Sequence, residues 1–252
     1  MITQKELISH LQQLLSCNRF KDYAPNGMQV EGKEQIKRIC TAVTASEDVI
    51  SQAIAWNADA LLVHHGYFWR GESPVITGMK RQRLQKLLSH EINLLAYHLP
   101  LDCHLELGNN ACLAKLFEVN SIQMHRIDDI DNLLWSGQLT KAMTNNELGE
   151  FLAEKLGRQP LMIEGHNRKI ERIAWCSGGA QDYIAEANRL GVDAYLSGEV
   201  SERTYYEAQE LGINYYACGH HATERYGIQA LGEYLSSSFD LEHVFFDSAN
   251  PV

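Results

Sequence analysis

Histidine stands out in this chain, because 11 histidines occur in 252 residues and imidazole can act as an acid, a base or a metal ligand at neutral pH. Six of these histidines fall in three short stretches, and each stretch directly follows an apolar run. The side chains of metal-binding type in the three stretches are His64, His65, His98, Asp102, His104, His220, His221 and Glu224. Such a concentration points to metal chemistry, provided that the fold brings the stretches together.

The apolar runs before these stretches belong to an alternation of short strands and helices. Strands are expected at residues 39–44, 60–63, 92–97, 173–176, 194–196 and 213–218, and helices at residues 47–55, 80–88, 146–156, 182–190 and 204–211. This alternation is typical of largely parallel sheets. In open α/β sheets ligands bind beyond the carboxyl ends of the strands, which is where the histidine stretches fall.

The chain also contains a weak internal repeat. Arg38-Ile39 recurs as Arg172-Ile173, and residues 59–62 recur as residues 193–196 with the same offset. The offset is smaller further along the chain, so the first copy holds extra residues in the loop after the His pair. That loop, residues 67–74, is aromatic and contains Gly and Pro, as is typical of a functional loop.

The repeat predicts an α/β fold of two similar domains related by internal duplication. Residues 1–126 form the first half, which carries the His pair and Asp102. Residues 127–252 form the second half, which carries the H-x-x-x-E motif of residues 220–224. We expect the two halves to be joined near residues 124–131.

Spacing within each stretch limits how its side chains can share an ion. Adjacent residues of a strand point to opposite faces, so His64 and His65 suit two neighbouring ions better than one. If a helix begins after Gly219, His220 and Glu224 stand at positions i and i+4 and form a chelating pair. Imidazole and carboxylate ligands fit zinc, iron or manganese. Two such ions roughly 3.5–4 Å apart can activate water for hydrolysis.

Each of these features also has a structural interpretation. A His pair after a strand is often structural, and Asp102 can cap a helix at residues 108–117. His220 and Glu224 can be an exposed helix pair. The coincidence of three strand ends nevertheless favours metal binding. Weaker candidates, which can orient a ligand or donate a proton, are His98, His104 and His221.

Composition limits the possible partners. The chain has 22 Lys+Arg against 32 Asp+Glu, a net charge of −10 that disfavours duplex nucleic acid. The six cysteines are scattered, Thr3 and Glu6 form a capping box in place of a leader, and no apolar run reaches the roughly 20 residues of a membrane span. We therefore expect a cytoplasmic protein with a small anionic substrate. A local basic cluster, which is either a phosphate site or a solvated helix face, consists of Arg70, Lys80, Arg81 and Arg83.

Five segments of the chain together resemble one known family. They are residues 22–30, 59–71, 98–102, 197–199 and 219–224, and they hold the His pair, the Asp and the H-x-x-x-E spacing. The combination is similar to the YbgI / Nif-three-like family, whose members are also called GTP cyclohydrolase 1 type 2 homologues. The similarity runs over the whole chain. Many relatives have Pro after the His pair, where this chain has Gly66.

The resemblance implies a dinuclear metal site in the cleft between two similar α/β domains, and a ring-shaped homohexamer. It implies that His65 and Asp102 hold one divalent ion, that His64 and His220 hold the other, and that Glu224 bridges both. Two interpretations of the function stay open, beside a third, single-stranded nucleic-acid binding in the cavity of a hexamer, which would require the basic cluster to line that cavity. One is a metal-dependent hydrolase that acts on a nucleotide-like or small phosphorylated substrate, damaged nucleotides included. The other is a non-catalytic metal-binding protein with an interaction or regulatory role.

Overall fold

The structure, a computed structural model, describes residues 1–252 as two compact units. Unit 1 consists of Met1–Leu101 and Gly227–Ala249. Unit 2 consists of Asp102–Tyr226 and Asn250–Val252. None of the helices is long and apolar enough to cross a membrane.

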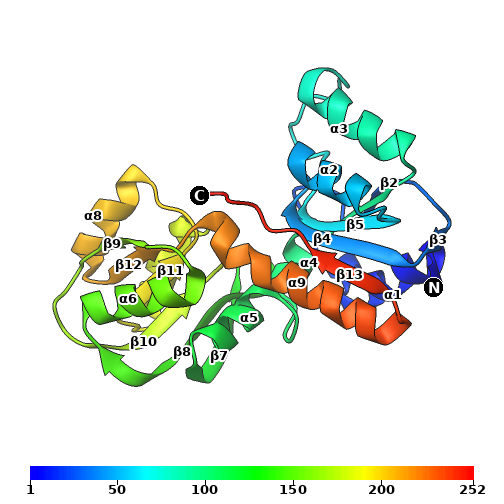
Figure 1. Cartoon of the computed structure of the whole chain (residues 1–252). Coiled ribbons are helices and arrows are strands. Elements are labelled where there is room, and N and C mark those ends of the chain that lie inside the picture. The colour runs from blue at the N-terminus through cyan, green and yellow to red at the C-terminus, as the bar shows by residue number, and fades with distance from the viewer. The chain divides into compact units, whose positions relative to one another are not determined.

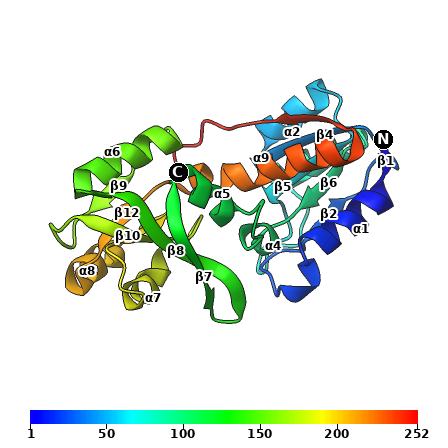
Figure 2. The ribbon, with the colours of Figure 1, turned by 90° about the horizontal axis from the view of Figure 1, so that it is seen from below.

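The division between the units falls earlier in the chain than the sequence predicts. Strand β7 (Val119–Ile127) pairs antiparallel with β8 (Ile130–Met143), so the region near residues 124–131 is a hairpin of unit 2 and not a linker (Figure 2). Asp128 lies in the turn with φ of 50°, a left-handed conformation that Asp tolerates better than most residues. Helix α9 (His220–Phe239) begins in unit 2 and ends in unit 1.

Unit 1 is built on a five-stranded sheet with the order β13-β4-β5-β6-β2. Figure 1 labels β13, β4, β5 and β2, and Figure 2 labels β6. All neighbouring strands in it are parallel except β2, which pairs antiparallel with β6. Its strands are β2 (Gly27–Val30), β4 (Arg38–Thr44), β5 (Ala60–His65), β6 (Asn93–Ala96) and β13 (Glu242–Phe245), and β1 (Ile2–Thr3) pairs separately with β3 (Gln35–Ile36). The helices before α9 are α1 (Gln4–Leu14), α2 (Glu47–Ala55), α3 (Gly78–Ser89) and α4 (Leu99–Asp102).

Unit 2 is built on a six-stranded sheet with the order β7-β8-β10-β11-β12-β9. Strands β10, β11 and β12 are parallel, and β8 and β9 flank them in antiparallel pairing. The remaining strands are β9 (Leu161–Ile163), β10 (Ile170–Trp175), β11 (Ala194–Ser197) and β12 (Asn214–Ala217). The helices are α5 (Asn109–Leu116), α6 (Asn145–Leu156), α7 (Ile184–Arg189) and α8 (Glu202–Leu211).

Most of the predicted elements are confirmed. The helix expected at residues 47–55 is α2, and Ser46 caps it by accepting from the backbone N–H of Val49. The capping box of Thr3 and Glu6 is formed at the start of α1. One helix differs, because the segment expected at residues 182–190 starts with a 3₁₀ turn before α7 begins.

The two sheets are buttressed by the same hydrogen bonds at repeat-related positions. In unit 1 the carboxylate of Asp59 accepts from the backbone N–H groups of Lys37 and Arg38, at 3.0 Å each. In unit 2 Asp193 accepts from the N–H groups of the two repeat-related residues at 2.9 and 3.0 Å. The buried Asn93, at the start of β6, accepts from the backbone N–H of Gly32. The buried Asn214, at the start of β12, accepts in the same way from Gly165. These hydrogen bonds lie at the amino ends of the strands, whereas the histidine stretches lie at the carboxyl ends.

We expect Asp59→Ala to lower the free energy of unfolding by about 1–3 kcal/mol at pH 7, because two strand N–H groups and Lys33 lose their acceptor. Burial raises the pKa of Asp59, but the hydrogen bonds from Lys37, Arg38 and Lys33 outweigh burial, and the net pKa lies below its usual value. The stabilisation is therefore fully present above the unfolded pKa of about 3.9 and is lost as the pH falls through the folded pKa.

Urea unfolding of both proteins at pH 7 and at pH 3 measures this difference. The exposed Asp48→Ala on α2 is the control and is expected to cost only a few tenths of a kcal/mol. A difference between wild type and Asp59→Ala that does not shrink at pH 3 would contradict the assignment.

Candidate metal centre

Three histidines gather at the carboxyl ends of β5 and β6 in unit 1. His64 and His65 end β5, and His98 follows β6. One ring nitrogen of each histidine lies within 4.8 Å of the other two. The ring centroids of His64 and His65 are 4.7 Å apart, so the strand pleat separates them less than the sequence predicts. His98, which the sequence ranks below the pair, has its ring centroid 5.0 Å from that of His64.

The Nδ1 atom of each of these rings lies at hydrogen-bond distance from an oxygen atom of a residue outside the cluster. His64 Nδ1 lies 2.9 Å from the backbone carbonyl of Tyr97, and His65 Nδ1 lies 3.2 Å from the hydroxyl of Thr44. Because a carbonyl can only accept, His64 donates from Nδ1, and in the neutral ring its Nε2 bears the lone pair. Histidines that bind metals commonly donate their other ring N–H in this way, because the bond fixes the tautomer and the ring orientation.

Asp22 supports His98 and is a functional residue that the sequence reasoning missed. Its side chain is 2% exposed, and His98 Nδ1 lies 2.7 Å from Asp22 Oδ1. Burial raises the pKa of Asp22, but the hydrogen bond and charge of His98, with the hydrogen bonds from Asn26 and Tyr23, outweigh burial and lower it. Asp22 belongs to one of the segments that carry the family resemblance, and no spacing rule connects it to His98.

Unit 2 contributes one histidine and two buried carboxylates. Because α9 begins at His220, His220 and Glu224 share a helix face, and His220 Nε2 lies 3.1 Å from Glu224 Oε2. Carboxylate oxygens of Asp102 and Glu224 lie within 4.8 Å of each other, and these residues are 5% and 3% exposed. Asp102 accepts from Asn109 Nδ2 at 2.8 Å and from Ser177 Oγ at 3.1 Å, and it does not cap α5, whose N-cap is Gly108.

The surroundings of His220 in unit 2 are strongly negatively charged. Burial lowers the pKa of His220, but the hydrogen bonds and charges of Glu224 and Glu199 outweigh burial and raise it to about 9. Burial, together with the charges of Asp102 and Glu224, raises the pKa of the Cys176 thiol. Two buried carboxylates this close repel each other strongly, and a bound cation removes that repulsion. The donor set of imidazole and carboxylate fits a divalent metal such as zinc, iron or manganese.

Gly178 makes room for the carboxylate of Glu224. It follows β10 with φ of +65°, and a Cβ atom built there would lie 2.2 Å from Glu224 Oε1 and 3.2 Å from His220 Nε2. Its backbone N–H donates to Thr223 Oγ1 at 3.0 Å, which ties the turn to α9. Gly178 therefore packs against both ligand candidates on α9.

The other predicted residues lie outside the groups described above. His104 Nδ1 accepts from the backbone N–H of Leu107 at 3.1 Å in the turn before α5. His221 is buried and its backbone N–H donates to the carbonyl of Val252. In the basic cluster, Arg70 Nη2 donates to the backbone carbonyl of Asp22, and Lys80 pairs with Glu72 at 3.3 Å. Arg81 is exposed and Arg83 is half-buried on α3.

Comparison with known proteins identifies relatives that span the whole chain. Residues 2–251 match a family described as Duf34/NIF3 (NGG1p interacting factor 3). A Yersinia pestis protein called GTP cyclohydrolase 1 type 2 homolog is 51% identical over 248 residues, which are 98% of each chain.

Solved structures also match along the full length. A structure titled protein ybgI, of unknown function, has a TM-score of 0.95 with 48% identity and covers 100% of both chains. A structure of a Thermus thermophilus protein has a TM-score of 0.91 with 30% identity and also covers 100% of both chains. The mixed α/β architecture is therefore shared with these proteins.

Proposed function

Because the chain belongs to the Duf34/NIF3 family, we propose that it is a dinuclear metal-dependent hydrolase that acts on a nucleotide-like or other small phosphorylated compound. The observation that carries this proposal is the pair of buried carboxylates, Asp102 and Glu224, next to His220 in unit 2. Burial of two adjacent negative charges is costly unless a cation neutralises them. The curated relatives carry the name GTP cyclohydrolase 1 type 2 homolog, which is in keeping with hydrolysis.

We further propose that the ligands of the two units hold the same pair of ions. His65 and Asp102 would hold one ion, His64 and His220 the other, and Glu224 would bridge them. With Glu224 shared, each ion would have three protein ligands, which is one fewer than a closed tetrahedral shell requires. A catalytic site needs such an open position for water and substrate. The support is the family resemblance together with the fixed Nδ1 atoms of the two unit 1 histidines.

When bound, the ions would acidify a water molecule and polarise the substrate oxygen that they contact. Side chains of the protein would orient the imidazoles and transfer the protons. Asp22 holds the Nδ1 proton of His98, so His98 Nε2 can accept a proton from water or return one to the leaving group. Glu199 holds His220 in the same way, with 2.6 Å between Glu199 Oε1 and His220 Nδ1. Both carboxylates are positioning residues for an imidazole.

We expect Glu199→Gln to weaken metal binding by roughly 10–100-fold, because outer carboxylates orient a ligating histidine and increase its basicity. The exposed Glu202→Gln on α8 is the matched control, which removes one carboxylate charge without touching His220. Competition with a chromogenic chelator measures both affinities. Equal affinity of Glu199→Gln and the wild type would contradict the positioning role.

The proposed hydrolysis is tested by incubating protein loaded with zinc, iron or manganese with a panel of nucleotides and phosphorylated metabolites. Mass spectrometry of the products separates the reaction classes. Release of formate from GTP would support a cyclohydrolase, whereas free phosphate or nucleoside would support a phosphoester hydrolase. Absence of turnover with every metal and every compound would contradict the proposal.

A second candidate function is a non-catalytic metal-binding protein that interacts with a partner. The family description names an interacting factor, which favours this alternative. It predicts that metal-loaded protein retains bound metal but releases no product from any compound of the panel. A hydrolase releases product, so the same screen separates the two.

We also propose that the two units descend from one duplicated ancestor, which would explain a metal centre assembled from both. Support comes from the matching strand order β2-β6-β5-β4 and β9-β12-β11-β10, and from the paired roles of Asp59 and Asp193. From the resemblance alone, we propose a ring-shaped homohexamer. Light scattering of the purified chain tests it, and a monomeric mass would contradict it.

A further inference from the structure

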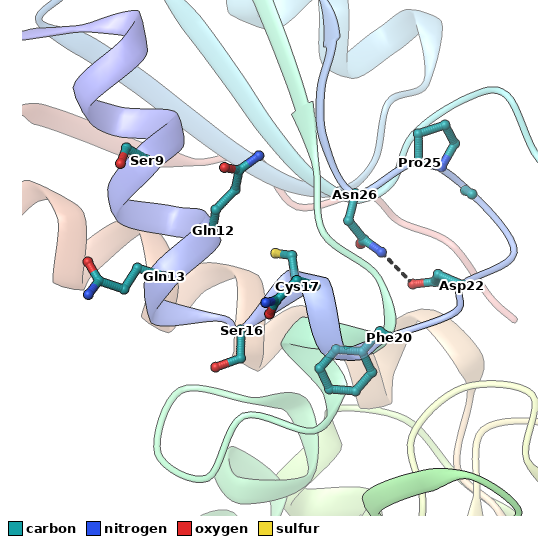
Figure 3. A pocket seen from close by; sticks show the side chains of 11 residues that line it. Ser9, Gln12, Gln13, Ser16, Cys17, Phe20, Asp22, Pro25 and Asn26 are labelled. Atoms are coloured by element: carbon teal, nitrogen blue, oxygen red, sulfur yellow. Dashed lines mark hydrogen bonds between the residues drawn. The ribbon is translucent and has the colours of Figure 1, made fainter.

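Unit 1 contains a pocket that none of the proposed metal ligands lines. It lies between α1 and the chain segment of residues 16–26 and has a volume of about 850 Å³ (Figure 3). Ligand pockets have volumes of roughly 300–1,000 Å³, so a small molecule fits in this one. Gln12 on α1 and Asn26 on the loop lie on opposite sides of the pocket, with Cys17 between them (Figure 3).

The pocket lining consists mainly of uncharged side chains that both donate and accept hydrogen bonds. These amides and hydroxyls belong to Ser9, Gln12, Gln13, Ser16, Asn18 and Asn26. An amide presents N–H donors and a carbonyl acceptor side by side, which is the arrangement that pairs with the edge of a nucleobase. Phe20 adds an aromatic ring to the lining, and flat heterocycles stack on such rings.

Charge in the pocket lining disfavours an anion. No lysine or arginine lines it, and the charged residue in the lining is Asp22. Four donors surround that carboxylate, the backbone N–H groups of Tyr23 and Leu99 and the side chains of Asn26 and His98. Helix α1 ends at Leu14 without a basic residue in its last turn, so the negative end of its dipole adds to the effect. A phosphate group would be repelled there, whereas an uncharged ring with N–H donors would be attracted.

One wall of the pocket also supports the histidine cluster. Asn26 Oδ1 accepts from the backbone N–H of His98 at 2.8 Å, and Asp22 holds the ring of the same histidine. The pocket lining and the support of His98 therefore share two residues, Asp22 and Asn26.

We propose that this pocket binds the nucleobase-like part of the substrate, a flat and uncharged heterocycle with N–H donors and nitrogen or oxygen acceptors. The link from the pocket to the substrate rests on the proposed function. Binding of the ring itself requires no metal, because none of the lining residues is a proposed ligand. Ring binding and hydrolysis can therefore fail independently.

The test uses the full chain, stripped of metal with a chelator and titrated calorimetrically with adenosine, guanosine, cytidine and uridine. We expect at least one of these uncharged nucleosides to bind, while ribose and inorganic phosphate produce no heat of binding. Gln12→Leu removes a donor and an acceptor at nearly constant volume and is expected to weaken that binding at least tenfold, about 1.4 kcal/mol. Gln85→Leu, an exposed position on α3 outside the pocket, is the control and is expected to leave binding unchanged.

Failure of all four nucleosides to bind would overturn the inference, because the amides of α1 would then be an ordinary solvated helix face. Equally tight binding of ribose would overturn it as well, since the sugar and not the ring would be recognised. Nucleoside binding without turnover in the hydrolysis screen would contradict the proposed hydrolase and leave the pocket assignment standing.

Discussion

Gly178→Ala is expected to lose metal affinity by roughly 10–100-fold while the chain stays folded. A Cβ atom at this position would lie 2.2 Å from Glu224 Oε1, so the carboxylate must leave the place that the structure gives it. The φ of +65° adds backbone strain of roughly 1–2 kcal/mol for any residue with a side chain. Metal content after dialysis, measured by plasma mass spectrometry, gives the affinity loss, and thermal unfolding gives the strain.

Gly212→Ala separates the strain from the loss of the ligand. Gly212 ends α8 with φ of +66°, almost the same conformation, and a Cβ atom there has nothing within 4 Å. We therefore expect Gly212→Ala to share the loss of stability but to bind metal like the wild type. Equal metal binding by both variants would mean that Gly178 does not shape the ligand geometry.

Glu224→Ala is expected to abolish the stabilisation that added metal gives to the wild type. A metal at about 1,000 times its Kd stabilises the folded protein by about 4.1 kcal/mol, which corresponds to roughly 8–16 °C in Tm for a chain of this size. Without metal two effects oppose each other, because removing Glu224 relieves the repulsion between two buried carboxylates but also removes the ion pair with His220. The difference in Tm between the metal-free variant and the metal-free wild type should therefore be much smaller than the metal-induced rise of the wild type.

Glu224→Gln is the matched variant for this experiment, since it keeps the volume of the side chain and removes only the charge. Differential scanning calorimetry of all three proteins, with and without zinc, reports both effects. A metal-induced rise in Tm of Glu224→Ala equal to that of the wild type would contradict the role of Glu224 as a ligand.

The sequence predicts the strands and the positions of the ligand candidates well, because both follow local rules. A short apolar run such as residues 60–63, which lies between two helical patterns, favours a buried strand, and β5 spans Ala60–His65. His220 and Glu224 are related by helix periodicity alone, and the 3.1 Å contact between them confirms that they face each other.

The supporting residues could not be predicted, because their contacts join distant parts of the chain. Asp22 and His98 are 76 positions apart, and Asp102 and Ser177 are 75 positions apart. Neither pair has a period or a motif that marks it. The role of Gly178 depends on the approach of α9 to the turn after β10, which is a property of the tertiary packing. The hairpin of β7 and β8 was not predicted either, because its two long antiparallel strands lie between the two copies of the repeat.

From the family resemblance we propose that ligands from both units hold one pair of divalent ions. It is tested most directly by the metal stoichiometry of wild type, His64→Ala and Glu224→Ala, each reconstituted with zinc and dialysed. We expect about two ions per wild-type chain and a clear loss in both variants, although His64 belongs to unit 1 and Glu224 to unit 2. Wild-type protein that retains no zinc, or a His64→Ala variant that retains the full wild-type content, would contradict it.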